Sequence, residues 1–135
     1  MIKQLILPIL TITLLSMARL QAYQNPKWIS PTWTDTIRNP LKGNNESVIG
    51  GKEVYTLQCI DCHGEKGSGD GPLSFDLTPR PSDFRSLKFQ NQSDGAIFWK
   101  ITNGNKPMPA FGTVLSIKQR WQVINYVRTF LNKSQ

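Results

Sequence analysis

The chain has 135 residues, among them 16 Lys plus Arg, 9 Asp plus Glu, one His and two Cys, and its formal net charge is +7 at pH 7. This length predicts one domain and excludes a multidomain enzyme, and two cysteines within one short motif exclude a disulfide-based scaffold. The basic side chains are scattered singly instead of forming a run or a helical stripe, which argues against nucleic acid as a partner.

The first residues have the features of a secretory signal. Lys3 precedes an apolar run over residues 5–15, and small residues follow the run, which is the order typical of an export signal. Cleavage is expected after Ala18 or Ala22, so residues 1–22 are assigned to the signal and a periplasmic protein is predicted. An uncleaved membrane anchor is the alternative, but the run is shorter than the ~20 residues that span a bilayer.

Residues 23–46 predict an extended arm ahead of a domain that occupies residues 47–135. The arm contains three prolines and has neither helical nor strand periodicity. Because Trp28 and Trp33 are costly to leave in water, we expect them to pin the arm to the domain. Docking of a partner by the arm is the alternative.

Three helices are predicted from Ser47 onward, which places the domain in the all-α class. Ser47 is expected to cap the first helix, in which Gly51, Tyr55 and Cys59 recur every four residues and so share one face. The second helix is expected to begin after the capping residue Ser93, to place Ile97 and Ile101 on one side, and to stop at Gly104.

The third helix opens with a capping box formed by Ser116 and Gln119. We expect it to end near Asn132, with a buried face that carries Trp121, Ile124, Val127 and Leu131. Long loops over residues 63–84 and 105–115 separate the three helices. A structureless segment as long as the first loop usually surrounds something functional.

The first loop follows the motif Cys59-x-x-Cys62-His63, which is typical of c-type haem attachment. Two thiols three residues apart at the end of a helix can add to the two vinyl groups of one haem, and the adjacent imidazole then lies beneath the iron. The motif therefore predicts one covalently attached haem c.

Three other uses of the same residues are less favoured. A thioredoxin-like thiol pair requires a preceding strand, whereas helical spacing precedes this motif. A zinc site requires four ligands, and the chain has no further Cys or His. A disulfide across so small a loop would remove little chain entropy.

Haem iron has a second axial position, for which Met108 is the candidate. It is the only methionine after residue 22, and it lies between Pro107 and Pro109, which restrict the backbone on both sides. A His/Met pair makes the iron six-coordinate and raises its reduction potential, which suits electron transfer. Simple core filling is the alternative for Met108.

With these motifs in place, residues 47–131 resemble the class I cytochromes c. Gly51 and Tyr55 lie eight and four residues before Cys59, where that family has a small residue and an aromatic residue against its closing helix; Tyr126 is the corresponding contact. Residues 103–112 are similar to the family's methionine loop, and residues 67–72 resemble the turn after the haem motif in many bacterial members. The resemblance implies a cytochrome c fold, with three main helices and long loops around one covalent haem.

The resemblance also implies supporting roles around the haem. The family commonly fixes the imidazole of its haem-ligating histidine with a proline carbonyl in the turn after the motif, a position that corresponds to Pro72. Candidate donors to the haem propionates are Arg80, Trp99 and Asn103. Ordinary structural or surface roles are the alternative for all four residues.

Together these features predict a periplasmic monohaem cytochrome c that passes single electrons between redox proteins, not an enzyme. A haem enzyme or gas-binding protein with an open distal site is the alternative, although the chain has no second His to act there. A subunit docked on a dehydrogenase or a membrane respiratory complex is an alternative to a free shuttle.

Lysines near the expected haem edge predict the charge of the partner. Lys66, Lys100 and Lys106 would form a basic rim that steers an acidic docking surface. The alternative is that neighbouring acidic residues cancel this field, namely Asp61, Glu65 and Asp70.

Overall fold

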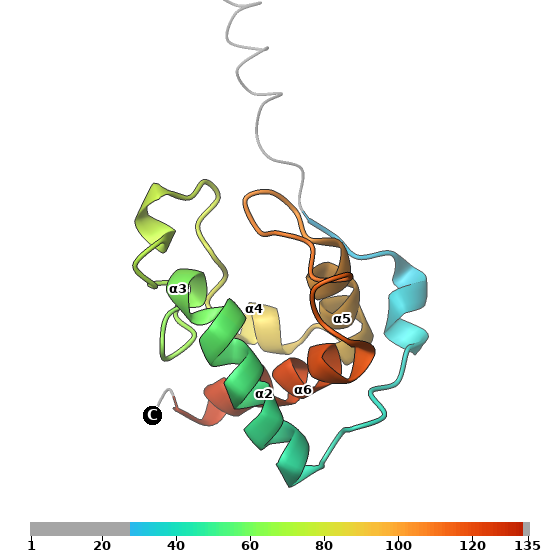
Figure 1. Cartoon of the computed structure of the whole chain (residues 1–135). Helices are drawn as coiled ribbons and strands as arrows, with labels where there is room; N and C mark the ends of the chain where they lie inside the picture. The colour runs from blue at the N-terminus through green and yellow to red at the C-terminus, as the bar shows by residue number, and fades with distance from the viewer. Residues whose placement is uncertain (1–27, 134–135) are drawn as a thin grey trace, which may run out of the picture.

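The computed structural model describes residues 28–133, so the expected signal over residues 1–22 and the start of the arm lie outside the described residues. Within residues 28–133 the regular elements are all helical, which confirms the all-α class (Figure 1). The α-helices are α2 (Asn45–Gln58), α3 (Ile60–His63), α4 (Leu87–Gln90), α5 (Asp94–Asn103) and α6 (Ile117–Arg128). The 3-10 helices are η1 (Thr32–Thr36), η2 (Ser74–Asp76) and η3 (Thr129–Lys133).

Helix α2 begins two residues before the expected cap. The side chain of Asn44 caps the helix by accepting from the backbone N–H of Ser47 at 3.0 Å. The prediction that Ser47 is the cap is therefore wrong. Ser47 is buried inside the first turn, where its hydroxyl accepts from Nδ2 of Asn125 at 2.5 Å, because an equally good capping residue lies three positions earlier.

The predicted starts of the other two long helices are confirmed. Ser93 caps α5 by accepting from the backbone N–H of Ala96 at 3.0 Å, and the helix ends before Gly104. Ser116 and Gln119 form the expected capping box at the start of α6.

The buried stripe of α6 does not continue to Leu131, and this part of the prediction is wrong. The α-helix ends at Arg128 and passes into η3, which has about three residues per turn instead of 3.6. The tighter turn buries Phe130 completely and leaves Leu131 41% exposed.

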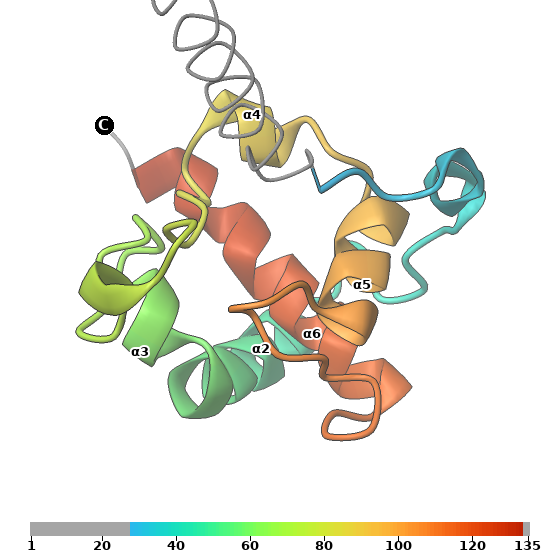
Figure 2. The same ribbon diagram turned by 90° about the horizontal axis from the view of Figure 1, so that it is seen from above.

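The crossing of α2 and α6 forms the centre of the core (Figures 1 and 2). A Cβ at Gly51 would overlap the carbonyl oxygen of Gln122 and lie 2.9 Å from Cβ of Tyr126. The ring of Tyr55 meets the rings of Tyr126 and Phe130 edge-on, with centroids 5.3 and 5.4 Å apart. The predicted contact of Tyr126 with Gly51 and Tyr55 is confirmed.

The arm is fastened to the domain only partly by the residues expected: Trp28 is half-buried, and the amine of Lys100 lies 5.5 Å from the centroid of its ring. The arm is not extended throughout, because η1 interrupts it. Trp33 is 57% exposed, so its predicted pinning role is wrong, whereas the neighbouring Thr34 is fully buried. Nδ2 of Asn39 donates to Asp94 of α5 at 3.0 Å and to Asn125 of α6 at 2.7 Å, so the arm joins the two helices.

Candidate functional site

The motif residues lie at the junction of two helices. Cys59 ends α2, and Cys62 and His63 lie in the single turn of α3 that follows. The backbone carbonyl of Cys59 accepts from the N–H groups of Cys62 and His63 at 3.2 and 2.9 Å, which holds the motif in a compact turn. Both cysteines are half-buried, and they are not bonded to each other.

Burial favours the neutral forms of Cys59 and His63. It raises the pKa of the Cys59 thiol to about 12 and lowers the pKa of His63 to about 4. A neutral imidazole is the form that binds a metal ion.

The orientation of the His63 ring is fixed from two sides. Nδ1 lies 3.3 Å from the carbonyl oxygen of Ser82, and the ring stacks on Phe84 with centroids 4.2 Å apart. In the tautomer whose Nδ1–H donates to Ser82, Nε2 keeps its lone pair for iron.

The carbonyl that faces Nδ1 of His63 is thus not that of Pro72, which is solvent-exposed. The returning limb of the loop brings Ser82 into place, because the backbone N–H of Phe84 donates to the carbonyl of Gly67 at 2.7 Å. Close packing of the limbs requires glycine at Gly69, where φ is 76° and a Cβ would overlap the carbonyl oxygen of Pro81. Sequence reasoning missed Ser82 and Phe84, because a contact of a backbone carbonyl across 19 residues has no sequence signature.

The methionine loop is a tight turn. The backbone groups of Asn105 and Met108 exchange two hydrogen bonds of 3.0 and 2.9 Å, and Met108 packs half-buried against the core. This loop stands beside the loop over residues 64–86, at the same end of the molecule (Figures 1 and 2). The two segments expected to flank the haem are therefore neighbours.

Helices α5 and α6 anchor the returning limb of the methionine loop. The backbone N–H of Gly112 donates to the carbonyl of Thr102 at 3.0 Å. The guanidinium of Arg120 donates to Oγ1 of Thr102 at 2.5 Å and lies 4.6 Å from the centroid of the Phe98 ring. Arg120 is 7% exposed; sequence reasoning missed it, because an arginine near a helix start is usually a surface residue.

The three candidate propionate donors come from two elements. Arg80, on the first loop, is exposed and lies 5.2 Å from the centroid of the Phe75 ring. Trp99 and Asn103 belong to α5, where Nδ2 of Asn103 donates to the carbonyl of Trp99 at 2.8 Å. Their contacts with propionates stay predictions.

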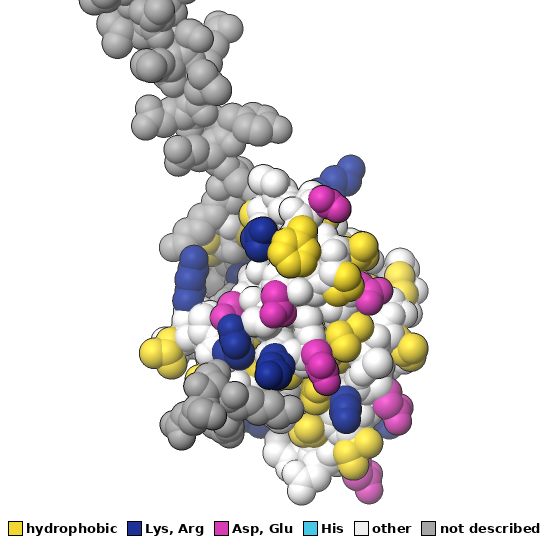
Figure 3. All heavy atoms as spheres, turned by 90° about the vertical axis from the view of Figure 1, so that its left-hand side faces the viewer, with side chains coloured by type: hydrophobic (Ala, Val, Ile, Leu, Met, Phe, Trp, Pro, Cys, Tyr) yellow, Lys and Arg dark blue, Asp and Glu magenta, His cyan; other side chains and the backbone are white. Residues whose placement is uncertain are grey.

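The expected basic rim is weaker than predicted. Lys100 is not a free surface cation, because its amine donates to Oε1 of Gln92 and lies 5.5 Å from the centroid of the Trp28 ring. Burial also lowers the pKa of Lys100. Lys66 and Lys106 are exposed. The face over α3 and the first loop carries acidic, basic and hydrophobic side chains interspersed (Figure 3).

The motif does not have the geometry of a metal-ion cluster. Between residues 28 and 133, no three His, Cys, Asp or Glu side chains come together as a group that could hold a metal ion. Haem attachment needs no such group of ligands, because the thiols bond to carbon and only the imidazole binds iron.

Comparison with known proteins decides the family. Residues 46–127, more than half of the chain, match the family described as cytochrome c oxidase, cbb3-type, subunit III. The chain belongs to this family. It is a class I monohaem cytochrome c, an electron-transfer protein whose one haem c is attached covalently.

The cytochrome is similar to two proteins named cytochrome c6. It is 29% identical to cytochrome c6 of Alaria esculenta over 86 residues, which are 64% of this chain and 94% of that protein. It is 30% identical to cytochrome c6 of Diacronema lutheri over 80 residues, which are 59% of this chain and 92% of that protein.

A solved structure with a similar fold comes from the Kuenenia stuttgartiensis reducing HAO-like protein complex. The match has a TM-score of 0.62 and 30% sequence identity, and it covers 70% of this cytochrome. The cytochrome spans about half of the matched chain, 49% of its length. In residues 28–133 the cytochrome has no helix with the length and hydropathy needed to cross a bilayer.

Proposed function

We propose that this cytochrome is a periplasmic one-electron carrier in which His63 and Met108 are the axial ligands of the haem iron. The observation that carries the proposal is the pairing of a fixed, neutral imidazole with a methionine held in a tight turn on the neighbouring loop. When bound, the haem supplies reversible one-electron chemistry.

The chain's own residues would bind and orient that group. Cys59 and Cys62 would each add sulfur and a proton across a vinyl double bond, which changes no oxidation state. Ser82 and Phe84 would keep the His63 ring at one angle. The rigid turn around Met108 would keep the thioether in place in both oxidation states, so that little reorganisation accompanies electron transfer.

Optical spectra test the ligation. Holoprotein expressed with haem-attachment machinery should show the weak near-infrared sulfur-to-iron band in its oxidised form and resist carbon monoxide in its reduced form. Met108→Ala should lose the band, lower the reduction potential and bind carbon monoxide readily, because a thioether preferentially stabilises ferrous iron. Rapid carbon monoxide binding by the wild type would overturn this proposal in favour of a haem enzyme or gas-binding protein.

The location and the partner are part of the same proposal. Export by residues 1–22 would place the cytochrome in the periplasm, and N-terminal sequencing of the exported protein should begin at Arg19 or Tyr23. Lys106, next to the methionine loop's first proline, would steer the acidic surface of a redox partner. A cytoplasmic, unprocessed holoprotein would contradict the proposed location.

A further inference from the structure

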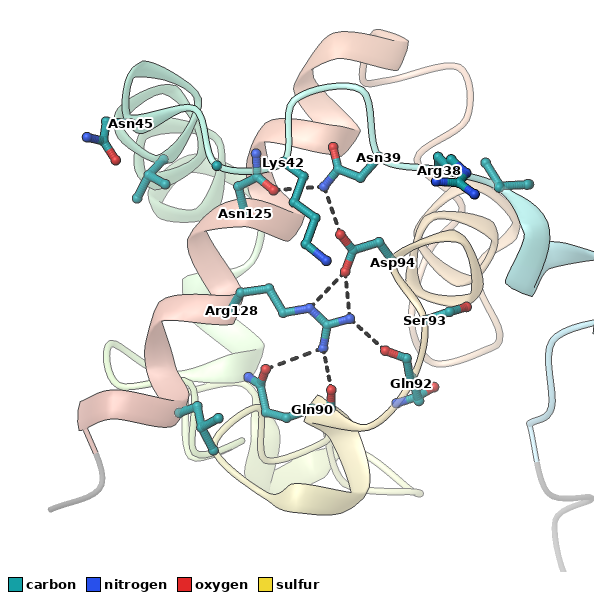
Figure 4. Close-up of a pocket in the computed structure, with 14 residues that line it drawn as sticks. Arg38, Asn39, Lys42, Asn45, Gln90, Gln92, Ser93, Asp94, Asn125 and Arg128 are labelled. Carbon is teal, nitrogen blue, oxygen red and sulfur yellow. Dashed lines mark hydrogen bonds and ion pairs between the residues drawn. The ribbon is translucent and has the colours of Figure 1, made fainter.

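A groove of about 820 Å³ lies between the arm, the start of α5 and the end of α6 (Figure 4). None of the residues that line it belongs to the haem-attachment motif or to the methionine loop. The groove is therefore separate from the site described above.

Basic side chains outnumber acidic ones in the lining. Arg38, Lys42 and Arg128 are basic, and Asp94 is the single acidic residue. Asp94 is already fully engaged: Oδ1 accepts from Nε and Nη2 of Arg128 at 2.9 and 2.6 Å, and Oδ2 accepts from Asn39 at 3.0 Å. The negative charge of Asp94 thus neutralises Arg128 alone.

Lys42 and Arg38 are left without an acidic partner among residues 28–133. The amine of Lys42 points into the groove (Figure 4), and both side chains are exposed. These two cations are available to carboxylates of another molecule.

The walls of the groove are ordered by hydrogen bonds. Arg128 donates to the backbone carbonyls of Gln90 and Gln92 at 2.8 and 2.6 Å, and Nδ2 of Asn125 donates to the carbonyl of Leu41 at 2.7 Å. A molecule that binds here meets a formed surface, so little ordering entropy opposes binding.

The groove also offers apolar contacts. Leu131, turned outward by η3, is 41% exposed in the lining, and the half-buried Ile37 and Val48 line it beside the core. A small inorganic anion would use neither these contacts nor most of the volume. Cations next to aliphatic side chains instead match a polypeptide with alternating acidic and aliphatic residues.

We propose that this groove docks an extended acidic segment of a partner protein, with carboxylates at Lys42 and Arg38 and an aliphatic side chain against Leu131. Since the lining includes neither loop of the haem site, docking would tether the partner while the haem site stays open for electron transfer. The proposal does not depend on which residue is the distal ligand.

The test is a titration of isotope-labelled reduced holoprotein with the acetylated, amidated peptide Glu-Leu-Glu-Glu-Leu-Glu, followed by backbone amide NMR. An ionic strength of about 10 mM is suitable, because the Debye length is then about 30 Å. Saturable shifts are expected at Lys42, Gly43 and Asn125. Lys42→Glu should weaken the peptide's affinity about tenfold, and Leu131→Ser should weaken it about threefold.

Lys118→Glu is the matched control, since it makes the same charge change at an exposed site outside the groove, and it should leave the affinity within about twofold of the wild type. Unchanged optical spectra show that each variant is folded around its haem. An equal loss of peptide affinity in Lys42→Glu and Lys118→Glu would overturn the proposal, as would equally tight binding of a peptide in which Gln replaces Glu. Displacement of the peptide by inorganic phosphate at matched ionic strength would reduce the groove to a small-anion site and also overturn it.

Discussion

The hydroxyl of Tyr55 donates a hydrogen bond of 2.6 Å to the carbonyl oxygen of Gly64, the residue that follows His63. Helix α2 thereby holds the end of the haem-attachment motif directly, through a side chain that is only 1% exposed. The same ring packs against Tyr126 and Phe130, so the motif is coupled to the closing part of the fold.

Tyr55→Phe should therefore lower the free energy of unfolding by about 1 kcal/mol near neutral pH, because one buried hydrogen bond is lost. Burial raises the pKa of Tyr55 above its usual range. Above pH ~10 the unfolded chain releases this proton and the folded chain does not, so this part of the stability is present at lower pH and is lost as pH rises. Denaturant titrations of holoprotein at pH 8 and 11 should show a smaller alkaline loss in the variant; an equal loss would contradict the prediction.

Gly51→Ala should destabilise the holoprotein by about 1–3 kcal/mol, because its Cβ would overlap the backbone of Gln122 and force α2 and α6 apart. Gly50→Ala is the matched control in the same helix. Its Cβ would meet only the flexible side chain of Gln122, and alanine gains up to about 1 kcal/mol of helix propensity. The midpoint temperature of thermal unfolding should be much higher in the control than in Gly51→Ala. Similar midpoints for the two variants would count against close helix packing at Gly51.

Thr102→Val should cost about 1–3 kcal/mol, because it leaves the buried guanidinium of Arg120 without its side-chain acceptor. Arg120→Met removes the charge together with the donor and should cost less than the valine change. Denaturant titrations of both single variants and the double variant form a thermodynamic cycle. We expect the double variant to lose less free energy of unfolding than the sum of the two single losses. Strict additivity would mean that the two side chains do not stabilise each other.

Lys106→Glu should slow electron transfer to an acidic redox partner about three- to tenfold at low salt, by reducing the rate of encounter. Raising the ionic strength to ~0.15 M shortens the Debye length to about 8 Å, so the wild-type rate should fall toward that of the variant. Lys52→Glu, at an exposed position of α2, serves as the charge-matched control in stopped-flow measurements. If the electron-transfer rate of the wild type did not change with ionic strength, docking would instead be assigned to the apolar residues of the methionine loop.

Sequence reasoning succeeded where the determining contact is local. The caps at Ser93 and Ser116 are hydrogen bonds within one turn, and such contacts depend on few neighbouring residues. The placement of the haem motif at the end of a helix follows from the four-residue spacing of Gly51, Tyr55 and Cys59.

Sequence reasoning failed where two neighbouring residues could both fill the same role, or where segments distant in the chain come into contact. Asn44 and Ser47 are both good capping residues, and only packing against α6 buries the second one. The exposure of Leu131 depends on a change from α- to 3-10 geometry, which the apolar pattern does not encode. The amine of Lys100 is taken up by Gln92, a tertiary contact that charge counting misses.

Asn39 contacts both α5 and α6, although the family match begins only at residue 46. A chain that began at residue 46 would leave the carboxylate of Asp94 without Asn39, and the amide of Asn125 without both Asn39 and the carbonyl of Leu41. The minimal folding unit therefore begins upstream of the region by which relatives are recognised, before the buried Thr34. Grafting this cytochrome onto another protein should preserve that upstream segment and place any linker ahead of Trp28.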